Sequence, residues 1–220
     1  MSVPGEKVAR LIMELRGLGI SDNRVLGAIE RTPREAFVPA AFAEQAYENV
    51  ALPIGHGQTI SQPLVVALMT QALDVNERHK ALEIGAGSGY QAAVLARLCR
   101  RVFTIERHRA LLKEAEARFA KLRLANITTR YGDGSKGWPE QAPFDRIICT
   151  AAATDVPGVL LDSLGEDGIL VAPVGPTRSD QQLLRVRRAG ERFDIDDLGP
   201  VRFVPLVEGL PRVARQEPHR

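Results

Sequence analysis

The stretch that determines the fold is Ala81-Leu-Glu-Ile-Gly-Ala-Gly-Ser-Gly-Tyr90. A short apolar run leads into a glycine cluster, and apolar side chains then recur at helical spacing over Gln91–Arg100. The pattern predicts a strand, a tight turn and a helix, the first half of a βαβ unit. Gly85, Gly87 and Gly89 permit positive φ angles and let a ligand approach the backbone beside the free N–H groups that begin the helix. We therefore expect a ligand at this turn.

The glycine spacing and the next acidic residue narrow the choice of ligand. Gly-x-Gly-x-Gly differs from the Gly-x-Gly-x-x-Gly that cradles a dinucleotide pyrophosphate. The next predicted strand, Arg101–Glu106, ends in a carboxylate about twenty residues after the turn, where Glu106 can accept both hydroxyls of a ribose. NAD and S-adenosylmethionine both satisfy this requirement, but a pyrophosphate fits the glycine spacing less well.

Two further acidic residues favour S-adenosylmethionine. Glu83 stands inside an apolar strand, where a buried charge needs a partner, and a cationic cofactor tail would supply one. Asp133 follows a third apolar run, Ile127–Arg130, within Tyr131-Gly-Asp-Gly134. At that strand end Asp133, with Gly134 beside it, can accept a hydrogen bond from an adenine amino group. A glycine turn with acids at successive strand ends fits an adenosyl-methionine site best.

The remaining pattern predicts an α/β protein with a doubly wound, mostly parallel sheet, because strands and helices alternate from residue 81 to 174. We divide residues 1–220, as a single domain, into a helical preface with a substrate loop (1–75), a cofactor-binding core (76–176) and C-terminal strands with a tail (177–220). The predicted C-terminal strands are a hairpin through Ala189-Gly190 and a last strand over Arg202–Val207, both antiparallel. The tail after residue 207 is expected to fray.

The segment Asn49–Gln62, rich in glycine and proline, is predicted to be a loop that ends where Pro63 opens a helix. It places the polar side chains of Gln58, Thr59 and Ser61 just before that helix. They could cap the helix or bind an anion, since the same donors serve both purposes. From spacing alone, capping by Ser61 or its neighbour Gln62 is the favoured interpretation.

Several segments resemble one family in order along the chain. Leu82–Tyr90 resembles motif I of the class I methyltransferases, and Gly57-Gln-Thr-Ile-Ser-Gln-Pro63 is similar to the signature of the protein-L-isoaspartate (D-aspartate) O-methyltransferases. The segments 143–152, 167–175 and 201–206 match that family too. The resemblance extends from about Val8 to Leu206. It implies the seven-stranded, mostly parallel sheet of class I methyltransferases, with S-adenosylmethionine as cofactor and S-adenosylhomocysteine as product.

The resemblance also implies a reaction, methylation of the free carboxylate of L-isoaspartyl residues in damaged proteins and peptides. The ester then closes to a succinimide, whose hydrolysis restores some normal aspartate. By motif position, Ser61 is the expected catalytic residue, orienting the carboxylate by hydrogen bonding, and Gln58 and Thr59 are expected to bind substrate. A carboxylate with a reference pKa of about 3.5–4 is ionised at neutral pH, so the site needs no base.

Composition excludes few partners and suggests a compartment. A formal charge of +2 gives no argument for nucleic acid or an anionic membrane as partner. Cys99 and Cys149 lack metal-ligand or Cys-x-x-Cys spacing, so we predict buried thiols, a reducing compartment and no metal. No apolar run approaches the roughly 20 residues of a membrane span, and no signal-peptide core follows the N-terminus. We expect a cytoplasmic protein, and the sequence does not specify an oligomeric state.

The sequence leaves three alternatives open. A related methyltransferase could act on an aspartate of a dedicated ribosomal peptide, but such relatives tend to carry an extra C-terminal region, and this chain ends at Arg220. A small-molecule O-methyltransferase would be expected to show a His or Lys base or metal-binding carboxylates near the site. A non-enzymatic cofactor-binding module would never produce S-adenosylhomocysteine. Leu64-Val-Val66 departs from relatives that carry His or aromatic residues there, so the preference for sequences flanking the isoaspartyl residue stays open. The sequence also leaves open whether the protein acts on D-aspartyl residues.

Overall fold

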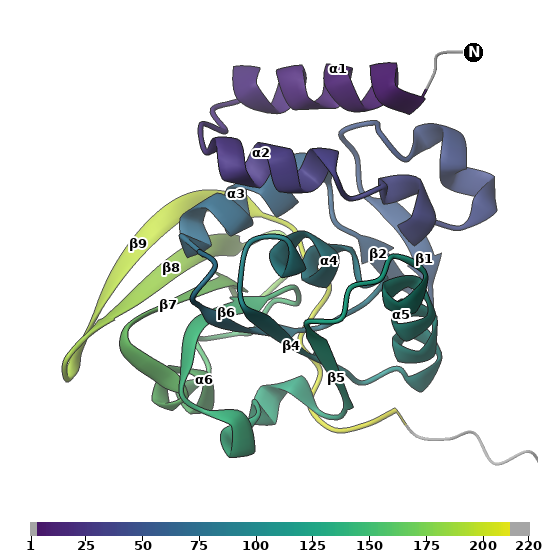
Figure 1. Ribbon diagram of the computed structural model, residues 1–220. Coiled ribbons are helices and arrows are strands. Elements are labelled where there is room, and N and C mark those ends of the chain that lie inside the picture. The colour runs from purple at the N-terminus through teal and green to yellow at the C-terminus, as the bar shows by residue number, and fades with distance from the viewer. Residues whose placement is uncertain (1–3, 212–220) are drawn as a thin grey trace, which may run out of the picture.

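The computed structural model describes residues 4–211 and is built around one seven-stranded sheet (Figure 1). The strand order is β5-β4-β3-β6-β7-β8-β9. The pairings from β5 to β7 are parallel, and the pairings of β7 with β8 and of β8 with β9 are antiparallel. The predicted fold class is confirmed. The strands are β3 (Lys80–Ile84), β4 (Arg101–Glu106), β5 (Ile127–Tyr131), β6 (Phe144–Cys149), β7 (Leu164–Val174), β8 (Gln181–Ala189) and β9 (Arg192–Val201).

Helices cover both faces of this sheet. On one face α3 packs against β6 and β7, while α4 and α5 pack against β4 and β5; α6 packs against β7. Two N-terminal helices, α1 and α2, form an outer layer above α3 and α4 (Figure 1). The predicted helical preface is therefore present as a layer of its own. The helices are α1 (Pro4–Gly17), α2 (Asn23–Glu30), α3 (Pro63–Leu73), α4 (Tyr90–Ala96), α5 (Arg109–Lys121) and α6 (Gly158–Asp162).

The central strands bury side chains on both faces, which explains why they appear in the sequence as continuous apolar runs. Along β3, Ala81 belongs to the core shared with α1 to α5, whereas Leu82 and Ile84 belong to the core on the α6 face. Trp138 packs into the second core, with its ring centroid 5.4 Å from that of Phe103 in an edge-on arrangement. Trp138 therefore contributes to this core and does not line the cavity described below.

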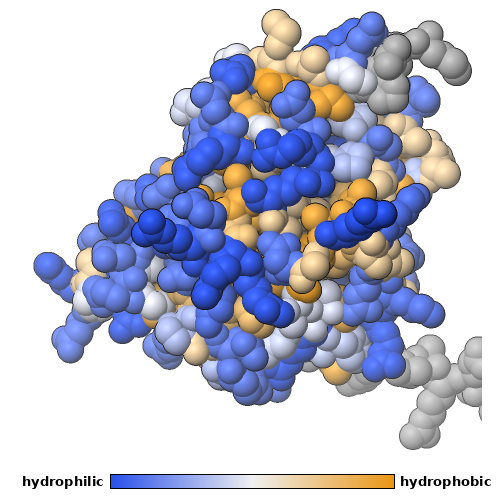
Figure 2. Space-filling model, viewed as in Figure 1, coloured by the Kyte–Doolittle hydropathy of each residue, from blue (hydrophilic) through white to orange (hydrophobic). Residues whose placement is uncertain are grey.

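Exposed hydrophobic side chains of the described residues are spread over several elements. Among residues 4–211, no helix is long and apolar enough to span a membrane. Most of the face in Figure 2 is hydrophilic, with hydrophobic side chains showing between the polar ones. The large hydrophobic side chains that are exposed lie on different elements, among them Met13 on α1, Val159 on α6 and Ile195 on β9.

The prediction of a loop over Asn49–Gln62 was wrong in one respect, because this segment contains an antiparallel hairpin. Its strands are β1 (Leu52–Gly55) and β2 (Gln58–Ile60). His56 and Gly57 form the turn with φ angles of 51° and 68°, the positive values that two-residue hairpin turns require. Burial of alternate β1 residues stabilises strands too short, and too rich in proline and glycine, to be detected from the sequence.

The predicted last strand over Arg202–Val207 was also wrong. β9 continues to Val201, and the following segment forms only an isolated bridge between Pro205 and Ala152. Proline has no N–H for a strand ladder, and the Phe203 N–H donates instead to the Gln181 side chain at 2.6 Å. The segment therefore crosses the carboxyl ends of the strands as irregular chain. Of the tail expected to fray, residues 212–220 lie outside the described residues.

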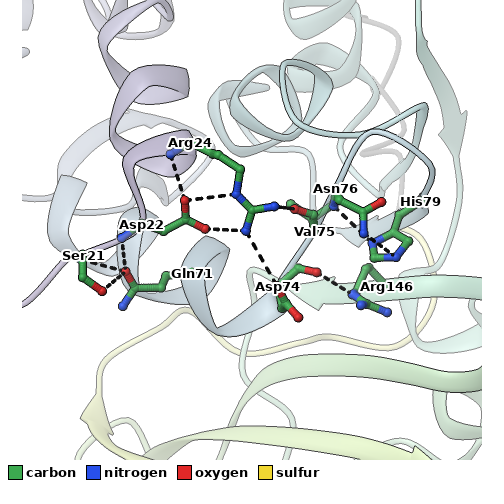
Figure 3. A network of polar contacts seen from close by, with 9 residues as sticks. All are labelled: Ser21, Asp22, Arg24, Gln71, Asp74, Val75, Asn76, His79 and Arg146. Carbon is green, nitrogen blue, oxygen red and sulfur yellow. Dashed lines mark hydrogen bonds and ion pairs between the residues drawn. The ribbon is translucent and has the colours of Figure 1, made fainter.

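A side-chain network fixes the outer helical layer to α3 (Figure 3). The Gln71 Oε1 atom of α3 accepts from the backbone N–H groups of Ser21 and Asp22, each at 2.9 Å. Asp22 in turn caps α2 by accepting from the Arg24 N–H at 2.8 Å. The Arg24 guanidinium reaches the Val75 carbonyl, just beyond α3, at 3.4 Å. The Gln71 side chain of α3 thus helps to hold α1 and α2, whose apolar faces also pack into the shared core.

Replacement of Gln71 tests this contribution. Gln71→Ala leaves two backbone N–H groups without their acceptor, so we expect the free energy of unfolding to fall by about 1 kcal/mol in urea titrations. Gln71→Glu keeps an acceptor oxygen at the same reach and should stay closer to wild type. Equal stability of the alanine variant and the wild type would contradict the network's role.

Candidate functional site

A cavity of about 250 Å³ lies at the carboxyl ends of β3 and β4, where ligands bind in open α/β sheets. Its wall combines the turn after β3, the β1–β2 hairpin and the C-terminal segment Val204–Val207. Eight of the ten residues predicted for the site line it, whereas Gly89 and Asp133 do not. The eight are Gln58, Thr59, Ser61, Glu83, Gly85, Gly87, Glu106 and Gly134.

The glycine turn requires its glycines for two different reasons. Gly85, Gly87 and Gly89 have φ angles of 96°, 53° and 89°, which L side chains rarely adopt. A Cβ on Gly85 would lie 2.5 Å from the Thr150 hydroxyl, so the neighbouring strand end demands glycine. A Cβ on Gly89 would lie 2.7 Å from the Phe119 ring of α5. Gly89 therefore allows α5 to pack behind the turn and supports the cavity from outside.

Glu106 fixes the shape of this turn. Its Oε2 atom accepts from the Gly87 N–H and its Oε1 atom accepts from the His108 N–H, both at 2.8 Å. A carboxylate has about four acceptor sites, so these two bonds leave capacity for hydroxyl donors from a ligand. The acid predicted to bind a ribose thus also holds the turn on which the ligand would rest.

Glu83 is a wholly buried acid in the cavity wall. Its Oε2 atom accepts from the Thr104 hydroxyl, the residue opposite it in the β3–β4 ladder. Its Oε1 atom has no partner within the described part of the chain. Burial raises the pKa of Glu83 to about 8. A wholly buried carboxyl with an unused oxygen is costly, so the pairing of Glu83 with a cationic ligand group stays a prediction that this geometry allows.

Asp133 lies beside the cavity, and contacts within the chain occupy its carboxylate. Its Oδ1 atom accepts from the N–H and hydroxyl of Ser135, at 3.0 and 2.7 Å, and its Oδ2 atom accepts from the Gly209 N–H at 2.7 Å. Burial alone would raise the pKa of Asp133, but these hydrogen bonds outweigh it and lower the pKa. Asp133 therefore anchors the C-terminal segment, and its neighbour Gly134 lines the cavity instead.

The hairpin presents Ser61 to the cavity without using it as a helix cap. The α3 N-terminus is capped by Asn49, whose Oδ1 atom accepts from the Leu64 N–H at 3.0 Å. Gln62 returns a bond from Nε2 to the Asn49 carbonyl at 2.8 Å. The capping interpretation favoured from spacing was therefore wrong. Within residues 4–211 the Ser61 hydroxyl makes no hydrogen bond, while its carbonyl accepts from Arg34 at 2.7 Å.

Sequence reasoning missed several wall residues, because their proximity arises only in the fold. Gln91, Arg107 and His108 line the cavity. His108 also stacks on His56 of the hairpin turn, with ring centroids 5.5 Å apart. The predicted cofactor site and the predicted substrate loop are therefore in contact. Burial lowers the pKa of His108. Their only sequence signal is their position directly after Tyr90 or Glu106.

Comparison with known proteins agrees with this geometry. Residues 6–210 match the family model described as protein-L-isoaspartate(D-aspartate) O-methyltransferase. The chain belongs to this family. The family match includes the hairpin, the glycine turn and the C-terminal segment, so every part of the cavity wall falls within it.

Relatives and solved structures of the family extend over most of the chain. A protein-L-isoaspartate O-methyltransferase of Rhodospirillum rubrum is 65% identical over 96% of this chain and 97% of its own length. A second one, of Rhodospirillum centenum, is 58% identical over 99% of this chain and 97% of its own length. A solved protein-L-isoaspartate O-methyltransferase superposes with a TM-score of 0.82 at 26% identity, over 90% of this chain and 65% of its own. A Plasmodium falciparum structure, titled a putative family member in complex with S-adenosyl-L-homocysteine, gives 0.79 at 24% identity, over 91% and 98%, and shares the fold.

The raised pKa of Glu83 predicts an unusual pH dependence of stability. Between the ordinary carboxyl pKa and about 8, the unfolded chain has lost the Glu83 proton while the folded chain retains it. Stability should therefore fall as pH rises through this window, by up to about 1.4 kcal/mol per pH unit. Glu83→Gln mimics the neutral carboxyl and should remove this contribution.

The measurement is urea unfolding of both proteins from pH 5 to 9, because their difference isolates Glu83 from other titrating groups. The glutamine variant should gain on the wild type as pH rises and level off above about pH 8. A difference that does not vary with pH would contradict the assignment.

Proposed function

We propose that this protein transfers the methyl group of S-adenosylmethionine to the free carboxylate of L-isoaspartyl residues in damaged proteins and peptides. The observation that carries the proposal is the free hydroxyl of Ser61, which lines the same cavity as the glycine turn and Glu83. One cavity therefore offers donors for an anionic acceptor beside a site for a cationic cofactor. The family match over residues 6–210 supports this activity.

The residues present fit the cofactor. The unused Oε1 atom of buried Glu83 suits the ammonium group of the methionyl part, and the Gly85 and Gly87 backbone lines the cavity beside it. Glu106 would accept the ribose hydroxyls, and Gly134 with Asp133 would flank the adenine. Gly89 would act from behind by shaping the turn. When bound, S-adenosylmethionine supplies an electrophilic methyl group on its sulfonium.

The chain's own residues have to orient the substrate carboxylate and exclude water from it. The carboxylate is already ionised at neutral pH, so no residue needs to remove a proton. The Ser61 hydroxyl, assisted by Thr59 and Gln58, would donate hydrogen bonds that direct a carboxylate oxygen toward the methyl group. Ile60 and the segment Val204–Val207 contribute apolar wall that excludes water from the nucleophile.

The product ester accounts for repair. The backbone nitrogen of the next residue attacks the methyl ester, methanol leaves, and a succinimide ring forms. Water then opens the ring on either side, which returns part of the chain to normal aspartate. These steps follow from the chemistry of the ester and need no further residue of the enzyme.

We also infer a single catalytic domain over residues 1–220. The cavity draws its wall from the hairpin within 1–75, the turn within 76–176 and the segment after 177, so none of these parts forms the site alone. A cytoplasmic location is supported by Cys99 and Cys149, free thiols whose pKa values burial raises to about 12. We propose isoaspartyl proteins and peptides as partners, without nucleic acid or membrane.

The test is methyl transfer from labelled S-adenosylmethionine to two synthetic peptides that differ only in isoaspartate or aspartate. We expect base-labile label in the isoaspartyl peptide alone. Cofactor binding without labelling of either peptide would instead favour methylation of a dedicated peptide.

Ser61→Ala tests the catalytic assignment. Loss of a hydrogen bond to a charged group, worth about 1.5–3 kcal/mol, should lower kcat/KM for the isoaspartyl peptide by roughly 10- to 150-fold. The Kd for S-adenosylmethionine should change less than about twofold. Ser163→Ala is the control, because the Ser163 hydroxyl bonds to the Val159 carbonyl on α6 and does not line the cavity. Wild-type activity in Ser61→Ala would rule out this role.

A further inference from the structure

Arg34 is a wholly buried cation that the proposed reaction has not yet used. It lies at the start of the short helical turn Arg34–Phe37, and its side chain is 0% exposed. Within residues 4–211, no aspartate or glutamate pairs with it. Burial lowers its pKa, yet a guanidinium keeps its proton in proteins. An uncompensated buried charge is costly, so its position calls for an explanation.

The guanidinium contacts two parts of the cavity wall, the end of the hairpin segment at Ser61 and the start of α4 at Tyr90. Its Nη2 atom donates to the Ser61 carbonyl at 2.7 Å and to the Val50 carbonyl at 3.4 Å, at the two ends of the hairpin segment. Its Cζ atom lies 4.8 Å from the centroid of the Tyr90 ring, at the first residue of α4. The Nε and Nη1 atoms have no partner among the described residues. Arg34 itself does not line the cavity.

We propose that Arg34 is the positioning residue for the substrate carboxylate, acting through Ser61 and supplying a buried positive charge behind this residue. The proposal rests on the proposed function, because a carboxylate substrate is what gives such a charge its use. By holding the Ser61 carbonyl, Arg34 fixes the hydroxyl of the same residue. By remaining unpaired, it leaves its charge available to an anion on the far side of Ser61.

The geometry separates this role from ordinary core packing. A guanidinium needed only for packing could be paired with an acid, which would cancel its field. Here its hydrogen-bonded partners are neutral backbone carbonyls, and a neutral aromatic ring lies over it. Tyr90, which it contacts, lines the cavity on the cofactor side. The charge therefore lies directly behind two residues of the cavity wall, Ser61 and Tyr90, and is shielded from solvent.

The experiment compares binding of two isoaspartyl peptides, one with the free α-carboxylate and one with an α-carboxamide, to wild type, Arg34→Gln and Arg34→Lys in the presence of S-adenosylhomocysteine. Glutamine can still donate to the Ser61 carbonyl but has no charge, whereas lysine keeps the charge. We expect Arg34→Gln to weaken carboxylate binding about 10- to 30-fold, as for unit charges roughly 8 Å apart at an effective dielectric constant of about 20. Carboxamide binding should change less than about twofold.

Arg34→Lys should retain most of the preference for the carboxylate, and the Kd for S-adenosylhomocysteine should stay constant in all variants. Arg97→Gln is the matched control, since Arg97 is a partly buried arginine that donates to the Thr32 hydroxyl at 2.9 Å, away from the cavity. If Arg34→Gln does not fold, Arg34→Met replaces it as the neutral variant.

The outcomes distinguish this proposal from the function on which it rests. Equal losses for carboxylate and carboxamide peptides, or a parallel loss of cofactor affinity, would show that Arg34 has only a structural role and would overturn the proposal. A wild-type protein that binds cofactor but neither methylates the isoaspartyl peptide nor prefers its carboxylate would instead overturn the proposed function.

Discussion

The hydrogen bond from the Gly87 N–H to Glu106 is the interaction on which the site depends. The turn after β3 passes through three positive φ angles, and the Gly85 and Ala86 N–H groups donate to the Ile105 carbonyl of β4, whereas the Gly87 N–H lies beyond this backbone pairing. Glu106, at the end of the adjacent parallel strand, supplies the missing acceptor, and the β3–β4 register places it there. Because both strands are buried on both faces, neither can shift without exposing core. The sheet therefore fixes the turn, and the turn fixes where a ligand can lie.

The N-terminal region matters to the site because it contains the β1–β2 hairpin, which forms one side of the cavity wall. The hairpin is stabilised by core contacts of Leu52 and Ile60 and by the Asn49 cap on α3, not by its own short ladder. Asn49 takes over the capping of α3 and thereby releases the Ser61 hydroxyl. Arg34 then ties the hairpin to the start of α4. The helical preface is thus part of the substrate side of the site as well as of the core.

The sequence predicted the fold well because the signals were local. Buried parallel strands give continuous apolar runs, and the bounds of β4 were predicted to the residue from such a run. The short hairpin and the segment Arg202–Val207 were misjudged, because burial against distant residues decides the conformation of such short stretches. Glu83 and Glu106 line one cavity as expected, because the strand ends of a parallel sheet meet at one edge, whereas Asp133 lies beside it. Arg34 and His108 could not be found, because their partners lie 27 and 52 residues away in the sequence, at Ser61 and His56.

The distribution of charge around the cavity gives the proposed reaction its direction. The acids Glu83 and Glu106 lie on the side of the glycine turn, next to Arg107 and His108, whereas the neutral donors of the hairpin lie on the other side with the buried Arg34 behind them. The acids would therefore hold a cationic cofactor at the turn, and the hairpin donors would hold an anionic substrate across the cavity from it. Because Glu83 is wholly buried, a cationic ligand group also restores the charged form that burial disfavours. Such a ligand lowers the free-energy cost of burying the ionised Glu83 carboxyl. The carboxyl that destabilises the empty fold at high pH would therefore contribute affinity for the cofactor.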